Sequence, residues 1–153
     1  MPLNGTLAKQ VNIKLPANVL FDVYRYRLHH ISQMSPDNVT SVDLLNGEWG
    51  TVGSVIVWNI IHDGKLIKAK EVIESIDEKN KTACFKLIGG DIMEAYKKFL
   101  LTIRVETQEE ESVMTWTFDY EKVTENIEDP HNLMELCLKC SKDIETYHLP
   151  KPN

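Results

Sequence analysis

Apolar and polar side chains alternate along most of the chain, a pattern that is typical of strands with one buried face. The alternation is clearest near the C-terminal end, where Phe99 and Leu101 share one face and Met114 and Trp116 share another. The predicted strands cover residues 5–14, 39–45, 52–61, 66–76, 82–88, 96–106 and 113–122. Most connections between them are too short for parallel crossovers, so we expect an antiparallel meander.

Helical spacing replaces this alternation in three places. Pro16 opens a short helical stretch, and a second one around residues 29–34 ends before Pro36. After Asp129, which we expect to be the N-cap, and Pro130, apolar residues recur at helical spacing for about five turns. The pattern predicts an α+β fold, in which a curved seven-stranded antiparallel sheet wraps around a long C-terminal helix and two short helices follow the first strand.

An internal cavity follows from this architecture. A single helix about 10 Å wide fills only part of a wide concave sheet. We therefore expect some of the apolar side chains on the inner face to line a cavity instead of filling a core.

Composition narrows the class of protein. With 153 residues, 42% of them hydrophobic, residues 1–153 are expected to form a single domain with a true core. The net charge of −6 argues against nucleic acid as a partner, since nucleic-acid-binding domains usually carry a basic face. No segment approaches the roughly 18 apolar residues of a membrane span, and no leader is recognisable, so we expect a cytoplasmic protein.

Two motifs with possible chemistry are better explained structurally. The glycines at 47, 50 and 53 precede a strand and lack the Gly-Lys-Ser/Thr ending of a phosphate loop, which favours a hairpin connection. Cys137 and Cys140 have the spacing of zinc and redox motifs, but no second ligand pair accompanies them. We interpret them as small buried residues that are able to line a pocket, and we expect no metal and no cofactor.

Three polar residues fall in phase with apolar faces. Glu71, Lys97 and Tyr120 are in register with strand residues that are expected to face inward. They are weak candidates for ligand contacts or for an acid/base set. The alternative is that each lies at a strand end with its polar tip in solvent. The catalytic residues, if there are any, are otherwise unknown.

Apolar residues on the inner faces are the candidates for ligand binding. The set is Phe85, Leu87, Phe99, Leu101, Met114, Trp116, Tyr120, Leu136 and Cys140.

Several motifs resemble the plant major latex proteins. The stretch 47–54 reads GEWGTVGS, Trp58 follows it, and residues 62–65 read HDGK. Further matches are the segment GDIM at 90–93 and KDI at 142–144, so the similarity runs over nearly the whole chain. These proteins belong to the superfamily of the birch-pollen allergen and the class-10 pathogenesis-related proteins.

The resemblance implies the helix-grip fold, a large hydrophobic cavity between the sheet and the C-terminal helix, and a plant source. It also implies binding of small hydrophobic metabolites, such as terpenoids, steroids, phenolics or lipids, for transport, storage or a defence response. The alternative is a cofactor-independent cyclase, isomerase or lyase of specialised metabolism, because the superfamily includes enzymes. A third class is an interaction or defence-signalling module. The expected state is a monomer or weak dimer.

Overall fold

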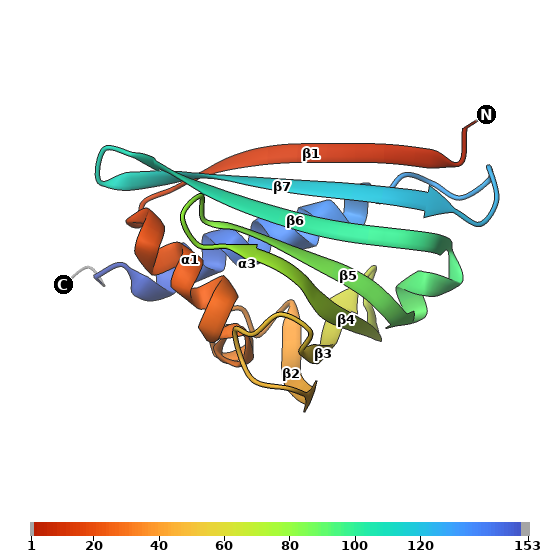
Figure 1. Ribbon diagram of the computed structural model, residues 1–153, viewed down its shortest axis with the longest axis horizontal. Coiled ribbons are helices and arrows are strands. Elements are labelled where there is room, and N and C mark those ends of the chain that lie inside the picture. The colour runs from red at the N-terminus through yellow and green to blue at the C-terminus, as the bar shows by residue number, and fades with distance from the viewer. Residues whose placement is uncertain (1, 151–153) are drawn as a thin grey trace.

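Seven strands form one antiparallel sheet in the computed structural model, which describes residues 2–150. The strands are β1 (Asn4–Ile13), β2 (Val39–Asn46), β3 (Val55–His62), β4 (Lys65–Asp77), β5 (Thr82–Gly90), β6 (Tyr96–Gln108) and β7 (Glu111–Lys122). The helices are α1 (Ala17–Tyr26), α2 (Ile31–Met34), α3 (His131–His148) and the short 3₁₀ turns η1 (Leu28–His30) and η2 (Asp91–Glu94). The chain path is shown in Figure 1.

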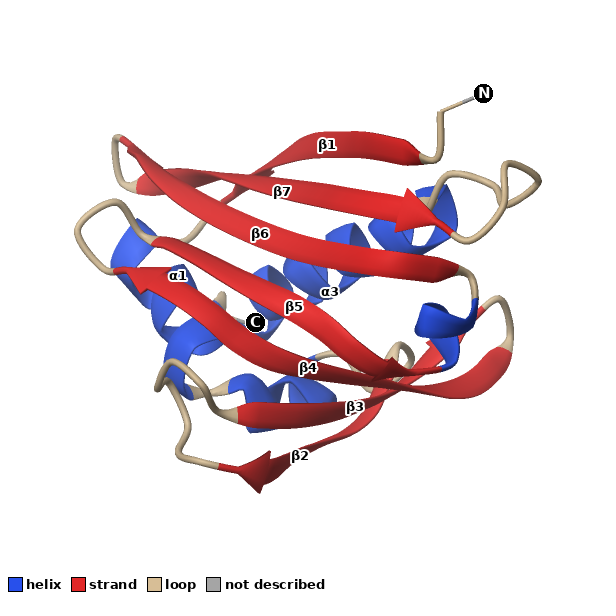
Figure 2. Ribbon diagram, turned by 45° about the vertical axis from the view of Figure 1, so that its right-hand side comes forward, coloured by secondary structure: helices blue, strands red, loops and turns tan. Residues whose placement is uncertain are grey.

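The order of strands in the sheet is β1-β7-β6-β5-β4-β3-β2. Strands β2 to β7 are neighbours in chain order, as the meander prediction requires, and β1 pairs with β7 along its whole length. The sheet is curved, and α3 lies against its concave side (Figure 2). The predicted α+β fold, with its seven-stranded antiparallel sheet and long C-terminal helix, is therefore confirmed.

The glycines in two of the turns have the positive φ angles that the sequence predicts. Asp63 and Gly64 join β3 to β4 with φ angles of 52° and 77°, as a two-residue hairpin requires. Gly47, Gly50 and Gly53 also have positive φ angles, which confirms a hairpin connection in this loop. Strand β3 begins at Val55 and not at the predicted residue 52, because Gly53 takes φ 91° and interrupts the extended backbone.

The start of α3 differs from the prediction. Pro130 occupies the N-cap position, and no side chain caps the helix. Asp129 is therefore not the N-cap. Its carboxylate accepts a hydrogen bond from the Tyr120 hydroxyl at 2.6 Å and lies 2.9 Å from Lys122 Nζ. The carboxylate of Asp129 therefore binds Tyr120 and Lys122 at the end of β7, and not the backbone amides of α3.

The core lies between the concave face of the sheet and the helices α1 and α3. Ile13, Leu20, Phe118 and Ile144 are among its fully buried side chains and come from four different elements. Within residues 2–150, no helix combines the length and the apolar character needed to cross a membrane. The apolar surface of the helices is instead turned toward the sheet, where it bounds the candidate site.

Candidate functional site

A cavity lies between the inner face of the sheet, α1 and α3. About 80 Å³ of it can be reached by the centre of a water molecule. Its lining is almost entirely apolar, with Glu71 as the exception. The lining residues are Tyr24, Leu28, Ile31, Val39, Trp58, Ile60, Ala69, Glu71, Phe85, Leu87, Ile92, Leu101, Trp116, Leu133, Leu136, Cys137 and Cys140.

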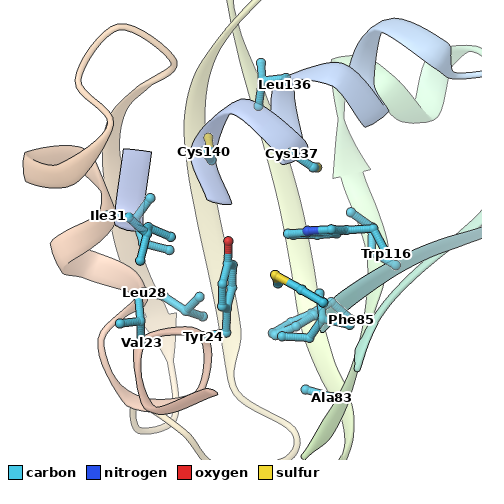
Figure 3. Packing of buried hydrophobic residues seen from close by; sticks show 14 of the residues in the cluster. Val23, Tyr24, Leu28, Ile31, Ala83, Phe85, Trp116, Leu136, Cys137 and Cys140 are labelled. Carbon is cyan, nitrogen blue, oxygen red and sulfur yellow. The ribbon is translucent and has the colours of Figure 1, made fainter. Parts of the chain in front are cut away.

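The cavity is smaller than the fold led us to expect. Most ligand pockets measure roughly 300–1,000 Å³. Aromatic side chains account for the difference, because Tyr24, Phe85 and Trp116 project into the interior below α3 (Figure 3). The rings of Tyr24 and Trp116 meet edge to face, with their centroids 5.6 Å apart. These rings therefore limit the free space in this conformation.

A buried hydroxyl of α3 organises these rings. Ser141 Oγ lies 2.9 Å from the Tyr24 hydroxyl and accepts a hydrogen bond from Trp116 Nε1 at 3.0 Å. Ser141 also bonds to the backbone oxygen of Cys137 one turn earlier. Complete burial raises the pKa of Tyr24 well above its ordinary value, so the phenol stays protonated. The three side chains fix one wall of the cavity.

Glu71 supplies the only carboxyl group of this lining. It lies on β4 between the buried residues Ala69 and Ile73, so the period of the strand directs it inward. The side chain is 5% exposed, and Oε1 accepts a hydrogen bond from Trp58 Nε1 at 2.6 Å. Burial raises the pKa of Glu71 to about 7, and the hydrogen bond from Trp58 partly opposes this rise.

The thiols of Cys137 and Cys140 both line the cavity from α3. They are free and buried, as their interpretation as small buried residues predicts. Desolvation raises the pKa of both thiols, that of Cys140 to about 11, so both are protonated at neutral pH. Among residues 2–150, no cluster of three or more His, Cys, Asp or Glu side chains is arranged to hold a metal ion.

Most of the residues expected to bind ligand are found in the lining. They are Phe85, Leu87, Leu101, Trp116, Leu136 and Cys140, together with the polar candidate Glu71. Phe99 and Tyr120 lie outside it, because they pack with Tyr96 in an aromatic cluster. Met114 also lies outside the lining, where its sulfur accepts a hydrogen bond from Ser141 at 3.5 Å.

Lys97 does not face the interior. The pairing of β6 with β7 shifts between Tyr96 and Lys98, so Lys97 is the extra residue of a β-bulge. Its side chain is 59% exposed and lies 3.9 Å from Glu121. The strand period that suggested an inward lysine is broken at this bulge.

The sequence reasoning missed the contribution of the helices after β1. Tyr24, Leu28 and Ile31 line the cavity from α1, η1 and α2. A signal for them exists, since Leu20, Tyr24 and Leu28 recur at the four-residue spacing of a helix face. Trp58 was also missed, although it shares a strand face with the buried Ile56 and Ile60.

A second, more open hollow of about 320 Å³ adjoins the cavity and shares Ile92 and Leu133 with it. We call it the outer hollow. Its polar and charged lining side chains are His62, Asp63, Asp91, Tyr96, Glu128, Asp129, His131 and Asn132. The shared residues make the outer hollow the immediate neighbour of the cavity.

Comparisons with known proteins agree with this geometry. The crystal structure of ginseng major latex-like protein 151 from Panax ginseng superposes with a TM-score of 0.93 at 38% identity, over 97% of this chain and 99% of that chain. MLP-like protein 43 of Arabidopsis thaliana is 36% identical over 149 residues, which are 96% of this chain and 94% of the relative.

Other relatives are longer. MLP-like protein 34 of Arabidopsis thaliana is 39% identical over 146 residues, which are 94% of this chain but 46% of the relative. The chain thus spans about half the length of the first curated relatives that it matches. The profile of the pathogenesis-related protein Bet v 1 family matches residues 2–151. The helix-grip arrangement, the cavity and these similarities together show that the chain belongs to the pathogenesis-related protein Bet v 1 family.

Proposed function

We propose that this protein binds small hydrophobic plant metabolites in its internal cavity, for transport, storage or a defence response in the cytoplasm. The observation that carries the proposal is the internal cavity, in which Glu71 is the one carboxyl group among apolar and aromatic side chains. Members of the Bet v 1 family bind hydrophobic ligands, which supports the same conclusion.

Apolar burial is the main source of affinity in such a site. It contributes about 25 cal/mol per Å² of surface removed from water, before the cost of ordering the ligand is subtracted. A small ring compound therefore suits the cavity in its present conformation. A larger ligand requires the ring of Tyr24 or Trp116 to move, which breaks a hydrogen bond to Ser141.

Calorimetric titration with the uncharged compound cyclohexylmethanol tests the proposal. We expect saturable binding to the wild type and loss of binding in Ala69→Leu, because Ala69 lines the cavity and a larger side chain fills it. Ala8→Leu is the matched control, since Ala8 is exposed on β1 and lies outside the cavity. Absence of saturable binding to the wild type, or equal binding by both variants, contradicts the proposal.

A second candidate function is isomerisation or cyclisation of a hydrophobic intermediate without a cofactor. The observation that favours it is the pKa of about 7 at Glu71, which suits a group that must both take and return a proton near neutral pH. In the test reaction, the isomerisation of cyclohex-3-en-1-one to cyclohex-2-en-1-one, Glu71 would remove a proton from C2 and return it to C4.

Ultraviolet absorbance follows this conversion. If Glu71 is the base, Glu71→Gln lowers the rate by about tenfold or more while binding of cyclohexylmethanol is retained. Equal rates for the wild type and the variant, or a wild-type rate equal to that in buffer, exclude Glu71 as the base of such a reaction.

A further inference from the structure

Glu71 is the one group in the cavity lining whose charge changes near neutral pH. The lining contains no Lys, Arg or His side chain. Its other titratable groups, Tyr24, Cys137 and Cys140, stay neutral because burial raises the pKa of each. The residues beside Glu71 on the neighbouring strands are Ile56 and Leu87, which are apolar. No cation of the protein therefore lies in the lining to balance an ionised Glu71.

The carboxyl group of Glu71 also has unused hydrogen-bonding capacity. Among the described residues, the one side-chain hydrogen bond to this carboxyl group comes from Trp58 Nε1 and is accepted by Oε1. An ionised carboxylate accepts up to about four hydrogen bonds, and a buried charge without a partner is costly. A ligand with a positive charge and several N–H donors would balance the charge of the carboxylate and donate hydrogen bonds to its free acceptor sites.

The charges of the outer hollow favour the same kind of ligand. Its lining includes the four acidic residues Asp63, Asp91, Glu128 and Asp129 and the two histidines His62 and His131, but no Lys or Arg. Lys122 pairs with Asp129 from outside the lining, so acidic groups remain in excess. A concave surface lined by one sign of charge attracts ligands of the opposite sign. A cation approaching through the outer hollow is thus favoured over an anion.

We propose that the ligand of this cavity is a small hydrophobic amine, whose ammonium group lies against Glu71 and whose hydrocarbon part fills the apolar space. An alcohol of the same shape offers one donor and no charge. A carboxylate of the same shape places a second negative charge beside Glu71. This inference rests on the proposed function of the cavity as a ligand-binding site.

Three probes of matched shape test the inference: cyclohexylmethylamine, cyclohexylmethanol and cyclohexanecarboxylate. Calorimetry at neutral pH measures the dissociation constant of each with the wild type, with Glu71→Gln and with Glu74→Gln. Glu74 is exposed on the same strand, so Glu74→Gln makes the same substitution outside the cavity. We expect the wild type and Glu74→Gln to bind the amine about tenfold or more tightly than the alcohol, and the carboxylate most weakly.

Glu71→Gln is expected to bind the amine and the alcohol equally well. The glutamine side chain keeps an oxygen that can accept the hydrogen bond from Trp58. A thermal melt shows whether Glu71→Gln is folded. Glu71→Asp retains the carboxyl group and provides a second variant. Equal affinity of the wild type for the amine and the alcohol overturns the inference and leaves the proposed function intact. An amine preference that survives in Glu71→Gln also overturns it. Binding of none of the three probes contradicts the proposed function itself.

Discussion

The hydroxyl of Tyr24 on α1 lies 2.9 Å from Oγ of Ser141 on α3, and this contact joins the two helices across the interior. Trp116 donates to the same Ser141 oxygen from β7. One hydroxyl group therefore holds two aromatic rings that bound the cavity. The free volume of the site depends on this polar contact as well as on the sizes of the apolar side chains.

The first prediction concerns Tyr24→Phe. The change removes the hydrogen bond to Ser141 but keeps the ring, so we expect the free energy of unfolding to fall by about 1 kcal/mol. Urea denaturation followed by fluorescence measures this change. Tyr26→Phe is the control, because Tyr26 is 43% exposed and should have little effect. Equal stability of the wild type and Tyr24→Phe would show that the hydrogen bond contributes nothing.

The second prediction is a pH dependence caused by Glu71. Its pKa is about 7 in the folded protein, against an ordinary value of 4.5. Between these values the unfolded chain has lost the proton and the folded protein retains it, so stability decreases as the pH rises from 4.5 to about 7. Below pH 4.5 the Glu71 carboxyl is protonated in both states, so its contribution to the free energy of unfolding is constant. The loss amounts to about 3 kcal/mol.

Glu71→Gln isolates this effect, because other carboxyl groups titrate in both proteins. The difference in unfolding free energy between the variant and the wild type is expected to grow across this window and then to level off. A constant difference for Glu71→Gln would mean that the Glu71 carboxyl has an ordinary pKa.

The third prediction concerns the close approach of Gly5 to Tyr120. The two residues are paired between β1 and β7, and a Cβ atom on Gly5 would lie 2.6 Å from the Tyr120 ring. That ring is buried against Tyr96 and Phe99, so it has little freedom to move. We expect Gly5→Ala to destabilise the protein by about 1–3 kcal/mol, measured by urea denaturation. In a Tyr120→Leu background the same change should cost much less.

The fourth prediction concerns thiol reactivity. Cys84 is partly exposed, whereas Cys137 and Cys140 are buried with raised pKa values. Iodoacetamide should therefore alkylate Cys84 about tenfold faster or more than the other two cysteines. Mass spectrometry after trypsin digestion resolves all three, because Lys139 separates Cys137 from Cys140. Comparable rates in the native protein would contradict the burial of Cys137 and Cys140. In urea, where the chain is unfolded, comparable rates for the three cysteines are the control.

The alternation of side chains was sufficient to predict the sheet, because each strand buries one face and its period is regular. The inward position of Glu71 follows from this period alone. The position of Lys97 does not, because a β-bulge adds a residue and changes which side chains face inward. A bulge depends on how two strands pair and leaves no local signal in the pattern.

The volume of the cavity also cannot be predicted from the pattern of apolar and polar residues along the chain. Tyr24 is recognisable as part of an apolar helix face, but its contact with Trp116 depends on how α1 packs against the sheet. The N-cap at Asp129 was predicted from local preference. It failed because Tyr120 and Lys122, which lie at the end of β7, bind that carboxylate instead.

The pairing of β1 with β7 has a consequence for how the chain acquires its structure. Asn4 lies opposite Glu121, and β7 is the one strand that pairs with β1. During synthesis β1 therefore has no partner in the sheet before β7 has been made. Closing so long a loop is entropically costly, and folding dominated by distant contacts is slow. During synthesis, β2 to β6 can pair in order as they leave the ribosome, while β1 remains an unpaired segment until β7 has followed them. The order of synthesis therefore allows β1 to enter the sheet only after β7 has been made.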